Sequence, residues 1–436
     1  MIFKLIEEND NYRNLKIGIW VYIFLLIFEG SIRKWILPSL SSPILIVRDP
    51  IAFYILFKSF QIGIFKKNKL IILFPLIGFI TFITALLFGH GNLYVAIYGL
   101  RPFILHFPLG FVIGIVFNRT DVLKVGKFFI YLSIMMILLN IYQFYSPQSS
   151  WINRGIGNDI DGGGFGGALG YFRPSGTFSF INGLTLFYGL TSAFVFYYLY
   201  QPKDISKSIL IISLLVAILS IPFTISRTIL FQNILCFIFS LFIIFKKPKH
   251  FKTLLISLFT LIIIVYLFVN NGFIKNGLEV FSSRFESANE SEGGLKGTLI
   301  DRMFLTLWDA IINSKDSSTF GYGLGFNSNV GIKILEINAE TRISDYEWNR
   351  TISEMGPFLG ILLILIRLKI LFSCFTIAIK KIRVNDFLPW MLLSFGFIQI
   401  LQGQIAQPTS VGFITLIIGL IYANFKKVSK INEIYQ

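Results

Sequence analysis

The chain has 436 residues, of which 54% are apolar and only 14% are charged, and its mean hydropathy is +0.71. These values exclude a soluble globular protein, because the apolar residues form blocks of about 17 to 25 that match the length of membrane-spanning helices. The formal net charge of +16 does not indicate nucleic-acid binding, because most of the excess lies in short turns between the blocks, where membrane topology explains it.

Twelve predicted spans follow one another along the chain, each close to the roughly 20 residues that cross about 30 Å of hydrocarbon. They cover residues 15–38, 43–63, 69–88, 93–117, 124–145, 178–200, 206–224, 226–246, 251–270, 351–371, 387–403 and 408–425. The residues before the first span are polar and that span lacks a small-residue cleavage site, so we expect an uncleaved anchor. Cys236 and Cys374 lie in or near spans without metal-ligand spacing. The sequence therefore predicts an all-α polytopic membrane protein with about 12 transmembrane helices.

Alternate connections between the spans are rich in lysine. The basic residues concerned are Lys58, Lys66, Lys67, Lys69, Arg119, Lys124, Lys127, Lys203, Lys207, Lys246, Lys247, Lys249, Lys252, Lys380, Lys381, Arg383, Lys426, Lys427 and Lys430. Because basic residues accumulate on the cytoplasmic side, this pattern predicts that both termini are cytoplasmic.

The opposite side carries two long connections. Residues 146–172 form a glycine-rich loop between spans five and six, within a first region of nine spans, 1–270. Residues 271–350 form an insert with two apolar-periodic stretches, around 278–285 and 302–312, which predict a small helical extracytoplasmic subdomain. Residues 351–436 supply the last three spans and a cytoplasmic tail.

Charged residues near the outer ends of spans one and two include Glu29, Arg33, Arg48 and Asp49. We expect them to form a structural ion-pair cluster. Arg101 lies about 14 Å along span four, deep enough to need a partner, and it either binds an anion or pairs with Glu29 or Asp49.

Two further arginines lie at outer span ends. Arg173 opens the segment Arg173-Pro174-Ser175-Gly176-Thr177-Phe178, with Asn182 nine residues after it, where free backbone N–H groups of a helix start favour an anion. Arg227 lies in the hairpin Ser226-Arg227-Thr228. The alternatives are a snorkelling arginine at a plain helix start and a charged residue that marks a tight turn.

The segment Asp345-Tyr346-Glu347-Trp348-Asn349-Arg350 leads to Glu354 in span ten. If a helix has begun by Glu347, then Glu347, Arg350 and Glu354 share one face. A carboxylate beside an arginine stays ionised while partly buried, as a catalytic base requires, but the same trio is also typical of a structural ion pair.

Five motifs together resemble the O-antigen polymerase and O-antigen ligase superfamily. They are R-P-S-G-T-F with Asn182, S-R-T at 226–228, D-R at Asp301-Arg302, G-x-G-x-G at 321–325 and E-x-G at 354–356. The resemblance covers about residues 95–370 and includes the long outer insert. It implies a membrane glycosyltransferase of the GT-C type, in the inner membrane of a bacterium, with its active site facing outward.

The resemblance also implies the substrates and the roles of residues. The donor and acceptor are glycans, the donor linked to polyprenyl pyrophosphate, and the enzyme needs no metal or other cofactor; a chain-length regulator is a possible partner. Arg173, Arg227 and Arg101 are assigned to the pyrophosphate, with Asn182 and Arg302 in the substrate site. Glu347 is the expected base, held by Arg350 and Glu354.

One departure from the family favours a polymerase over a ligase. Ligases carry a His-Asn pair about nine residues before the E-x-G glutamate, where this chain has Asp345 and Tyr346. Asp345 is therefore the second candidate for the base. The rival function is a flippase or transporter of lipid-linked glycans, which favours internal repeats and polar residues through both membrane halves; neither is visible here.

Overall fold

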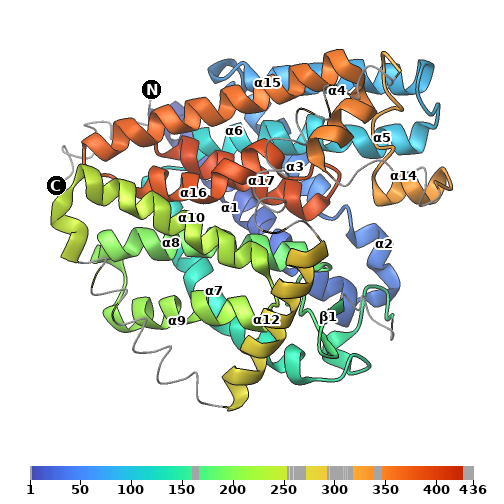
Figure 1. The fold of residues 1–436 in the computed structure, drawn as a ribbon. Coiled ribbons are helices and arrows are strands. Elements are labelled where there is room, and N and C mark those ends of the chain that lie inside the picture. Colours follow the sequence, from blue (N-terminus) through green and yellow to red (C-terminus); the bar gives the residue numbers. More distant parts are fainter. Residues whose placement is uncertain are drawn as a thin grey trace.

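The computed structural model describes residues 2–159, 166–252, 255, 259, 272–291, 294, 308, 310, 312, 318–337 and 346–425. Almost all of the regular structure there is helical (Figure 1). The helices are α1 Ile2–Ser31, α2 Ser41–Ile44, α3 Arg48–Gln61, α4 Leu70–Leu87, α5 Leu93–Arg101, α6 Phe107–Val116, α7 Arg119–Tyr145, α8 Ile181–Tyr200, α9 Lys207–Phe223, α10 Arg227–Lys246, α12 Gly272–Ser291, α14 Asn329–Ile334, α15 Glu347–Arg383, α16 Leu388–Gln402 and α17 Pro408–Ala423. Two short strands, β1 Gly166–Ala168 and β2 Tyr171–Phe172, pair antiparallel in the connection before α8.

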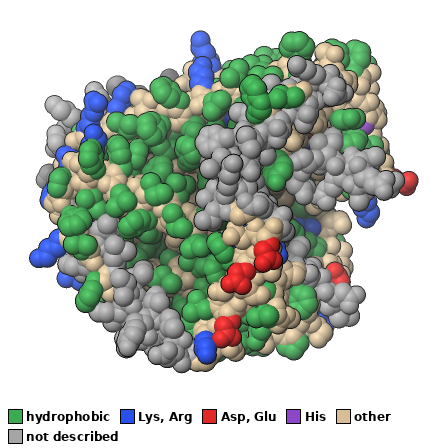
Figure 2. Space-filling view, viewed as in Figure 1, with side chains coloured by type: hydrophobic (Ala, Val, Ile, Leu, Met, Phe, Trp, Pro, Cys, Tyr) green, Lys and Arg blue, Asp and Glu red, His purple; other side chains and the backbone are tan. Residues whose placement is uncertain are grey.

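This is an all-α membrane protein. Within the described residues, seven helical segments are long and apolar enough to cross a membrane, and three shorter apolar helices, α9, α16 and α17, accompany them. Hydrophobic side chains gather on the left part of the face shown in Figure 2, and lysines and arginines lie along its left edge. The total of 12 spans stays a prediction, since span 251–270 lies almost entirely outside the described residues.

The backbone departs from three predicted spans where proline or glycine intervenes. Predicted span 93–117 consists of α5 and α6 joined by a π-helical turn, Pro102–His106. Predicted span 43–63 contains α2 and α3. Predicted span 351–371 lies within α15, which breaks at Gly356 (φ 75°, ψ 166°). Pro357 forces the residue before it into extended ψ, and glycine tolerates the positive φ.

The break at Gly356 turns α15 into a helical hairpin. A Cβ on Gly360 would lie 2.8 Å from Ile352 Cα, and Arg367 Nη1 lies 2.8 Å from Glu347 Oε1. Residues 347–355 therefore run back along residues 357–367. We expected Glu347 at the entrance of a straight span; instead it lies beside Arg367, about 16 Å along the second arm at 1.5 Å per residue.

The closest helix packing joins α6 and α17, which run parallel. Gly110 and Gly114 of α6 form a G-x-x-x-G pair, and a Cβ on Gly114 would come within 2.5 Å of Tyr422 Cβ in α17. On the other side, a Cβ on Gly419 would lie 2.5 Å from Ile113. Small residues at this spacing let membrane helices approach closely, so α6 and α17 form the centre of the bundle.

Connections that were predicted to share the cytoplasmic side lie together. Arg119 at the start of α7 donates to Asp386, with 3.0 Å between Nη2 and Oδ1, and Gln201 after α8 donates to the Asn385 carbonyl oxygen. We call this the lysine end of the bundle. Which side of the membrane it faces stays a prediction.

The opposite end gathers the long connections, and we call it the loop end. In Figure 1, α2, α5, α14 and β1 mark it at the right. From the insert 271–350, helix α12 packs against α9 and β1, and Tyr145 at the end of α7 stacks on Phe273, with 4.4 Å between ring centroids. The described part of the insert thus covers the bundle directly, and the helical subdomain stays a prediction.

Candidate functional site

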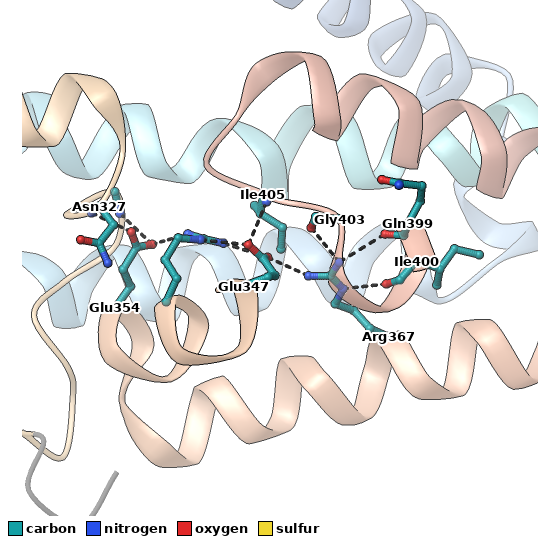
Figure 3. Close-up of polar contacts among 10 residues, drawn as sticks. Asn327, Glu347, Glu354, Arg367, Gln399, Ile400, Gly403 and Ile405 are labelled. Carbon is teal, nitrogen blue, oxygen red and sulfur yellow. Dashed lines mark hydrogen bonds and ion pairs between the residues drawn. The ribbon is translucent and has the colours of Figure 1, made fainter. Parts of the chain in front are cut away.

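A buried chain of ion pairs crosses the α15 hairpin. Arg350 donates through Nε and Nη2 to Glu347, at 3.0 and 2.9 Å, and through Nη1 to Glu354 at 2.7 Å. Arg367 on the second arm donates through Nη1 to Glu347 at 2.8 Å. Figure 3 shows Glu354 and Asn327 at one end of this chain, Glu347 in the middle and Arg367 at the other end. Two carboxylates and two guanidinium groups thus neutralise one another inside the bundle.

Arg367 also fixes the end of α16. Its guanidinium donates to the carbonyl oxygens of Ile400 and Gly403, at 2.7 and 2.8 Å, and Ile405 N–H donates to Glu347 at 3.2 Å. Carbonyls at a helix C-terminus lack partners within the helix and carry partial negative charge, so a buried arginine stabilises them. The hairpin and the connection from α16 to α17 are therefore one rigid unit.

The two glycine motifs meet at the other end of this network. Within the segment 321–325, Gly323 N–H donates to the carbonyl oxygen of Glu354, and Gly325 and Asn327 donate their N–H groups to its carboxylate at 3.4 and 2.8 Å. A Cβ on Gly321 would lie 2.5 Å from Gly356 N, so only glycine permits this contact. The motifs G-x-G-x-G and E-x-G thus pack against each other, and we call this contact the joint.

This geometry indicates that Glu347 is a structural anchor, which holds the two arms of the α15 hairpin together. Its side chain is only 1% exposed, and four donors from Arg350, Arg367 and Ile405 surround its two oxygens. A general base needs an oxygen within reach of the proton that it takes, and here each Glu347 oxygen already accepts from two donors. The expected role of Glu347 as the base finds no geometric support. Asp345, the second candidate, lies outside the described residues.

Three arginines converge at the loop end from separate elements. Arg173 follows β2, Arg227 begins α10, and Arg284 lies on α12. Burial, together with the charges of Arg284 and Arg227, lowers the pKa of the Arg173 guanidinium to about 10. Its Nε is buried without a hydrogen-bond partner among the described residues. We call these residues the arginine cluster; Arg302, also expected in the site, lies outside the described residues.

The segment that carries Arg173 is held firmly from both sides. Lys34, only 3% exposed, donates to Ser175 Oγ at 3.0 Å and to the Gly176 carbonyl oxygen at 2.7 Å. Gly176 N–H donates in turn to Gln143 at 2.9 Å. The glycine has a φ of 57°, which lets the chain reverse after Pro174. Arg173 thus lies on a preorganised loop and not on a helix end that snorkels toward water.

Arg101 forms an ion pair with Asp49, which is one of the alternatives that the sequence left open. Its Nη2 lies 2.9 Å from Asp49 Oδ1, and Nε donates to the other oxygen of Asp49. His106 Nε2 lies 3.3 Å from Asp49, and His106 Nδ1 lies 2.8 Å from Tyr22 Oη. Arg101 also lines a small pocket of about 30 Å³ with Arg350 and Glu354, but its bidentate fork is already used by Asp49.

Asn182 lines a large cavity of about 1020 Å³ at the loop end. Its Nδ2 donates to Gln407 Oε1 at 2.8 Å, which joins the start of α8 to the connection before α17. Segment 173–183 connects the arginine cluster to this cavity, because Arg173 begins the segment and Asn182 lies near its end. Ser179 lines both the cavity and a small pocket that Arg173 also lines.

Sequence reasoning missed two arginines whose signals were present. Arg367 interrupts the apolar run 361–366, and such a charge deep in a span calls for a partner. Arg284 lies within the amphipathic stretch 278–285 that was predicted to be helical. Across the described ranges, no three His, Cys, Asp or Glu side chains gather as a metal site.

No family model, curated protein or solved structure matches this chain.

Proposed function

We propose that this chain is a membrane glycosyltransferase of the O-antigen polymerase or ligase type. It joins polyprenyl-pyrophosphate-linked oligosaccharides on the outer face of a bacterial inner membrane, with both termini in the cytoplasm. The observation that carries this proposal is the arginine cluster, where Arg173, Arg227 and Arg284 converge and no described carboxylate forms an ion pair with Arg173. Cations that are partly removed from water come together at a cost unless an anion joins them.

Pyrophosphate is an anion suited to such a cluster. The planar guanidinium fork donates two parallel hydrogen bonds to phosphate oxygens, which a lysine cannot reproduce. A charge pair about 4 Å apart is worth roughly 4 kcal/mol at an effective dielectric of 20. The cluster therefore binds the donor and stabilises the negative charge that develops on the leaving phosphate oxygen.

The reaction requires few other functional groups from the protein. Pyrophosphate is a good leaving group, so the remaining tasks are to position two glycans and to accept one proton. The joint between segment 321–325 and the α15 hairpin serves positioning, because it fixes the outer wall of the site to the membrane helices.

Deletion of the gene tests this proposal through the surface glycans of the cell. A polymerase leaves single repeat units on the acceptor, and a ligase leaves no attached glycan and accumulates lipid-linked polymer. Complementation with Arg173→Lys should fail to restore the glycan at normal protein level. Repeat units trapped on the cytoplasmic leaflet would instead indicate a flippase and overturn the proposal.

A further inference from the structure

The large cavity at the loop end has the lining of a saccharide site. Its volume of about 1020 Å³ lies at the top of the usual range of ligand pockets, roughly 300–1,000 Å³. Polar side chains line it from several elements, and two aromatic rings accompany them. The lining includes Arg33, Tyr98, Ser179, Phe180, Asn182, Lys333, Gln407 and Thr409. Phe180 is 45% exposed and offers an apolar face against which a sugar ring can pack.

Glu29 is the one carboxylate among the described residues that line this cavity. Its two oxygens differ in their partners. Oε2 accepts from Arg48 Nε at 3.0 Å, and Arg48 is only 2% exposed, so this contact fixes the position of the carboxylate. Oε1 has a single long contact of 3.4 Å with Arg33 Nη1.

The guanidinium of Arg33 makes shorter hydrogen bonds to other groups than to Glu29. Its Nε donates to the Ser41 carbonyl oxygen at 2.7 Å, and its Nη1 donates to Ser179 Oγ at 3.0 Å, closer than its contact with Glu29. An acidic oxygen accepts two or more hydrogen bonds when fully satisfied. Glu29 Oε1 therefore keeps acceptor capacity for a group that enters the cavity.

The oxygens of three other carboxylates each accept a hydrogen bond shorter than the 3.4 Å contact of Glu29 Oε1. The oxygens of Glu354 accept from Arg350 and from two backbone N–H groups, and those of Asp49 accept from both sides of the Arg101 fork. Glu347 is surrounded by four donors, and none of these three side chains lines the large cavity. Glu29 is thus the described carboxylate best placed to touch a bound substrate.

We propose that this cavity binds the acceptor saccharide and that Glu29 Oε1 takes the proton of its attacking hydroxyl, an inference that rests on the proposed function. The hydroxyl oxygen forms a bond to the anomeric carbon of the donor, and the bond from that carbon to the pyrophosphate oxygen breaks. The electron pair leaves with the pyrophosphate, and the hydroxyl proton passes to Glu29. Glu29 then releases the proton to water.

The segment 173–183 connects the two substrates in this arrangement. Arg173 at its start faces the leaving pyrophosphate, and Ser179, Phe180 and Asn182 near its end face the acceptor. The paired amides of Asn182 and Gln407 retain hydrogen-bonding atoms for sugar hydroxyls. One rigid loop therefore sets the distance between the attacking and leaving groups.

The experiment uses the full chain purified in detergent, a synthetic lipid-pyrophosphate repeat unit as donor and a water-soluble oligosaccharide of the same repeat as acceptor. Glu29→Gln keeps an oxygen for Arg48 but is no base, so kcat should fall about 100-fold or more while the acceptor KM changes little. Glu29→Asp should restore part of kcat. Gln407→Ala should weaken acceptor binding on the order of 10-fold with kcat nearly kept. Thermal unfolding in detergent shows whether each variant is folded, and calorimetry measures how tightly it binds the acceptor.

The outcomes distinguish a failure of the proposed function from a failure of the acceptor site or of the base role of Glu29. Full transfer by Glu29→Gln overturns the base role and leaves the proposed function intact. Acceptor binding that is unchanged in Gln407→Ala and also in Phe180→Ala overturns the saccharide site. A wild-type protein that binds the acceptor but transfers nothing overturns the proposed function and the base role, whereas the saccharide site stands.

Discussion

Gly321 and Gly356 lie backbone against backbone where segment 318–328 crosses the turn of the α15 hairpin. A Cβ on Gly321 would lie 2.5 Å from Gly356 N, and a Cβ on Gly356 would lie 2.2 Å from the Thr319 carbonyl oxygen. Both residues have positive φ, of 72° and 75°. This contact places the N–H groups of Gly325 and Asn327 on the Glu354 carboxylate.

Gly356→Ala should open this joint. The new methyl group meets backbone at 2.2 Å and the backbone is left-handed, so we expect a loss of about 2 kcal/mol or more in stability, with a matching loss of activity. Thermal unfolding in detergent measures the first effect. Gly166→Ala is the matched control, because nothing lies within 4 Å of its Cβ position. Equal stability of both variants would contradict the proposed joint.

Glu347→Gln should destabilise the protein far more than a surface substitution. The change leaves Arg367 buried without its carboxylate, a situation that costs about 3–5 kcal/mol when one partner of a buried pair is removed. Glu336→Gln, at an exposed glutamate, should stay within about 0.5 kcal/mol of wild type. If Glu347→Gln melts like wild type and yet loses transfer, Glu347 acts in catalysis and the anchor role is wrong.

Arg173→Gln should stabilise the substrate-free protein. A pKa near 10, below the usual value of 12.5, means that folding disfavours the charged form. That penalty is present in full below pH 10 and relaxes only above it, so the variant should gain roughly 1 kcal/mol, about 2 °C in Tm, equally at pH 6 and pH 8.

Pyrophosphate should raise the Tm of the wild type and not that of Arg173→Gln, with chloride at equal ionic strength as the salt control. Arg383→Gln serves as the matched cation control, since Arg383 is exposed at the end of α15, at the lysine end of the bundle. A pyrophosphate effect that persists in Arg173→Gln would remove Arg173 from the anion site.

Acid should destabilise the protein through His90, in the turn between α4 and α5, because protonation of the half-buried ring removes the acceptor of Asn92 N–H. His90 Nδ1 accepts from Asn92 N–H at 3.0 Å, which places the ring proton on Nε2, 3.1 Å from the Leu324 carbonyl oxygen. Burial lowers the pKa of His90 below its usual 6.5, so the unfolded chain takes up the proton first. Stability is therefore full above pH 6.5 and declines as the pH falls through that value. His90→Gln should show a shallower loss of Tm between pH 7 and pH 5; an identical slope would assign the effect to other groups.

Cysteine labelling tests the orientation of the bundle. The native Cys236 and Cys374 are buried, so background should be low. Ser291→Cys should react with an impermeant reagent added to spheroplasts, whereas Lys249→Cys should react only after lysis, because the lysine distribution puts residue 249 in the cytoplasm. Labelling of Lys249→Cys in intact spheroplasts would invert the topology.

Hydropathy locates helices well where the backbone is uninterrupted. Predicted spans 226–246 and 124–145 correspond to α10 and to most of α7. It does not register the π-helical turn at Pro102 or the reversal at Gly356, because both lie in predominantly apolar stretches. A hydropathy window sums the transfer free energy of side chains and contains no term for backbone reversal.

The sequence likewise predicted some contacts of the candidate site and missed others. Helical spacing brings Glu347, Arg350 and Glu354 onto one face, and the structure pairs them. Their partner Arg367 depends on the hairpin, which spacing along a straight helix does not contain. Ion-pair reasoning placed Glu29 in a structural cluster, and the structure does pair it with Arg33 and Arg48. The unequal contacts of its two oxygens depend on the three-dimensional neighbours, which the sequence does not give.

The α15 hairpin also constrains how the protein enters its membrane. The first arm, with Glu347, Arg350 and Glu354, has a net charge of −1, and Arg367 on the second arm neutralises it only when both arms are side by side. Taken singly, each charge near the bilayer centre opposes insertion by about 2.5–3.5 kcal/mol. Residues 347–355 emerge from the ribosome before Arg367, so they stay at the aqueous surface until the second arm exists. We therefore expect the hairpin to enter the membrane as a neutral unit, after the helices α1 to α10 that precede it in the chain.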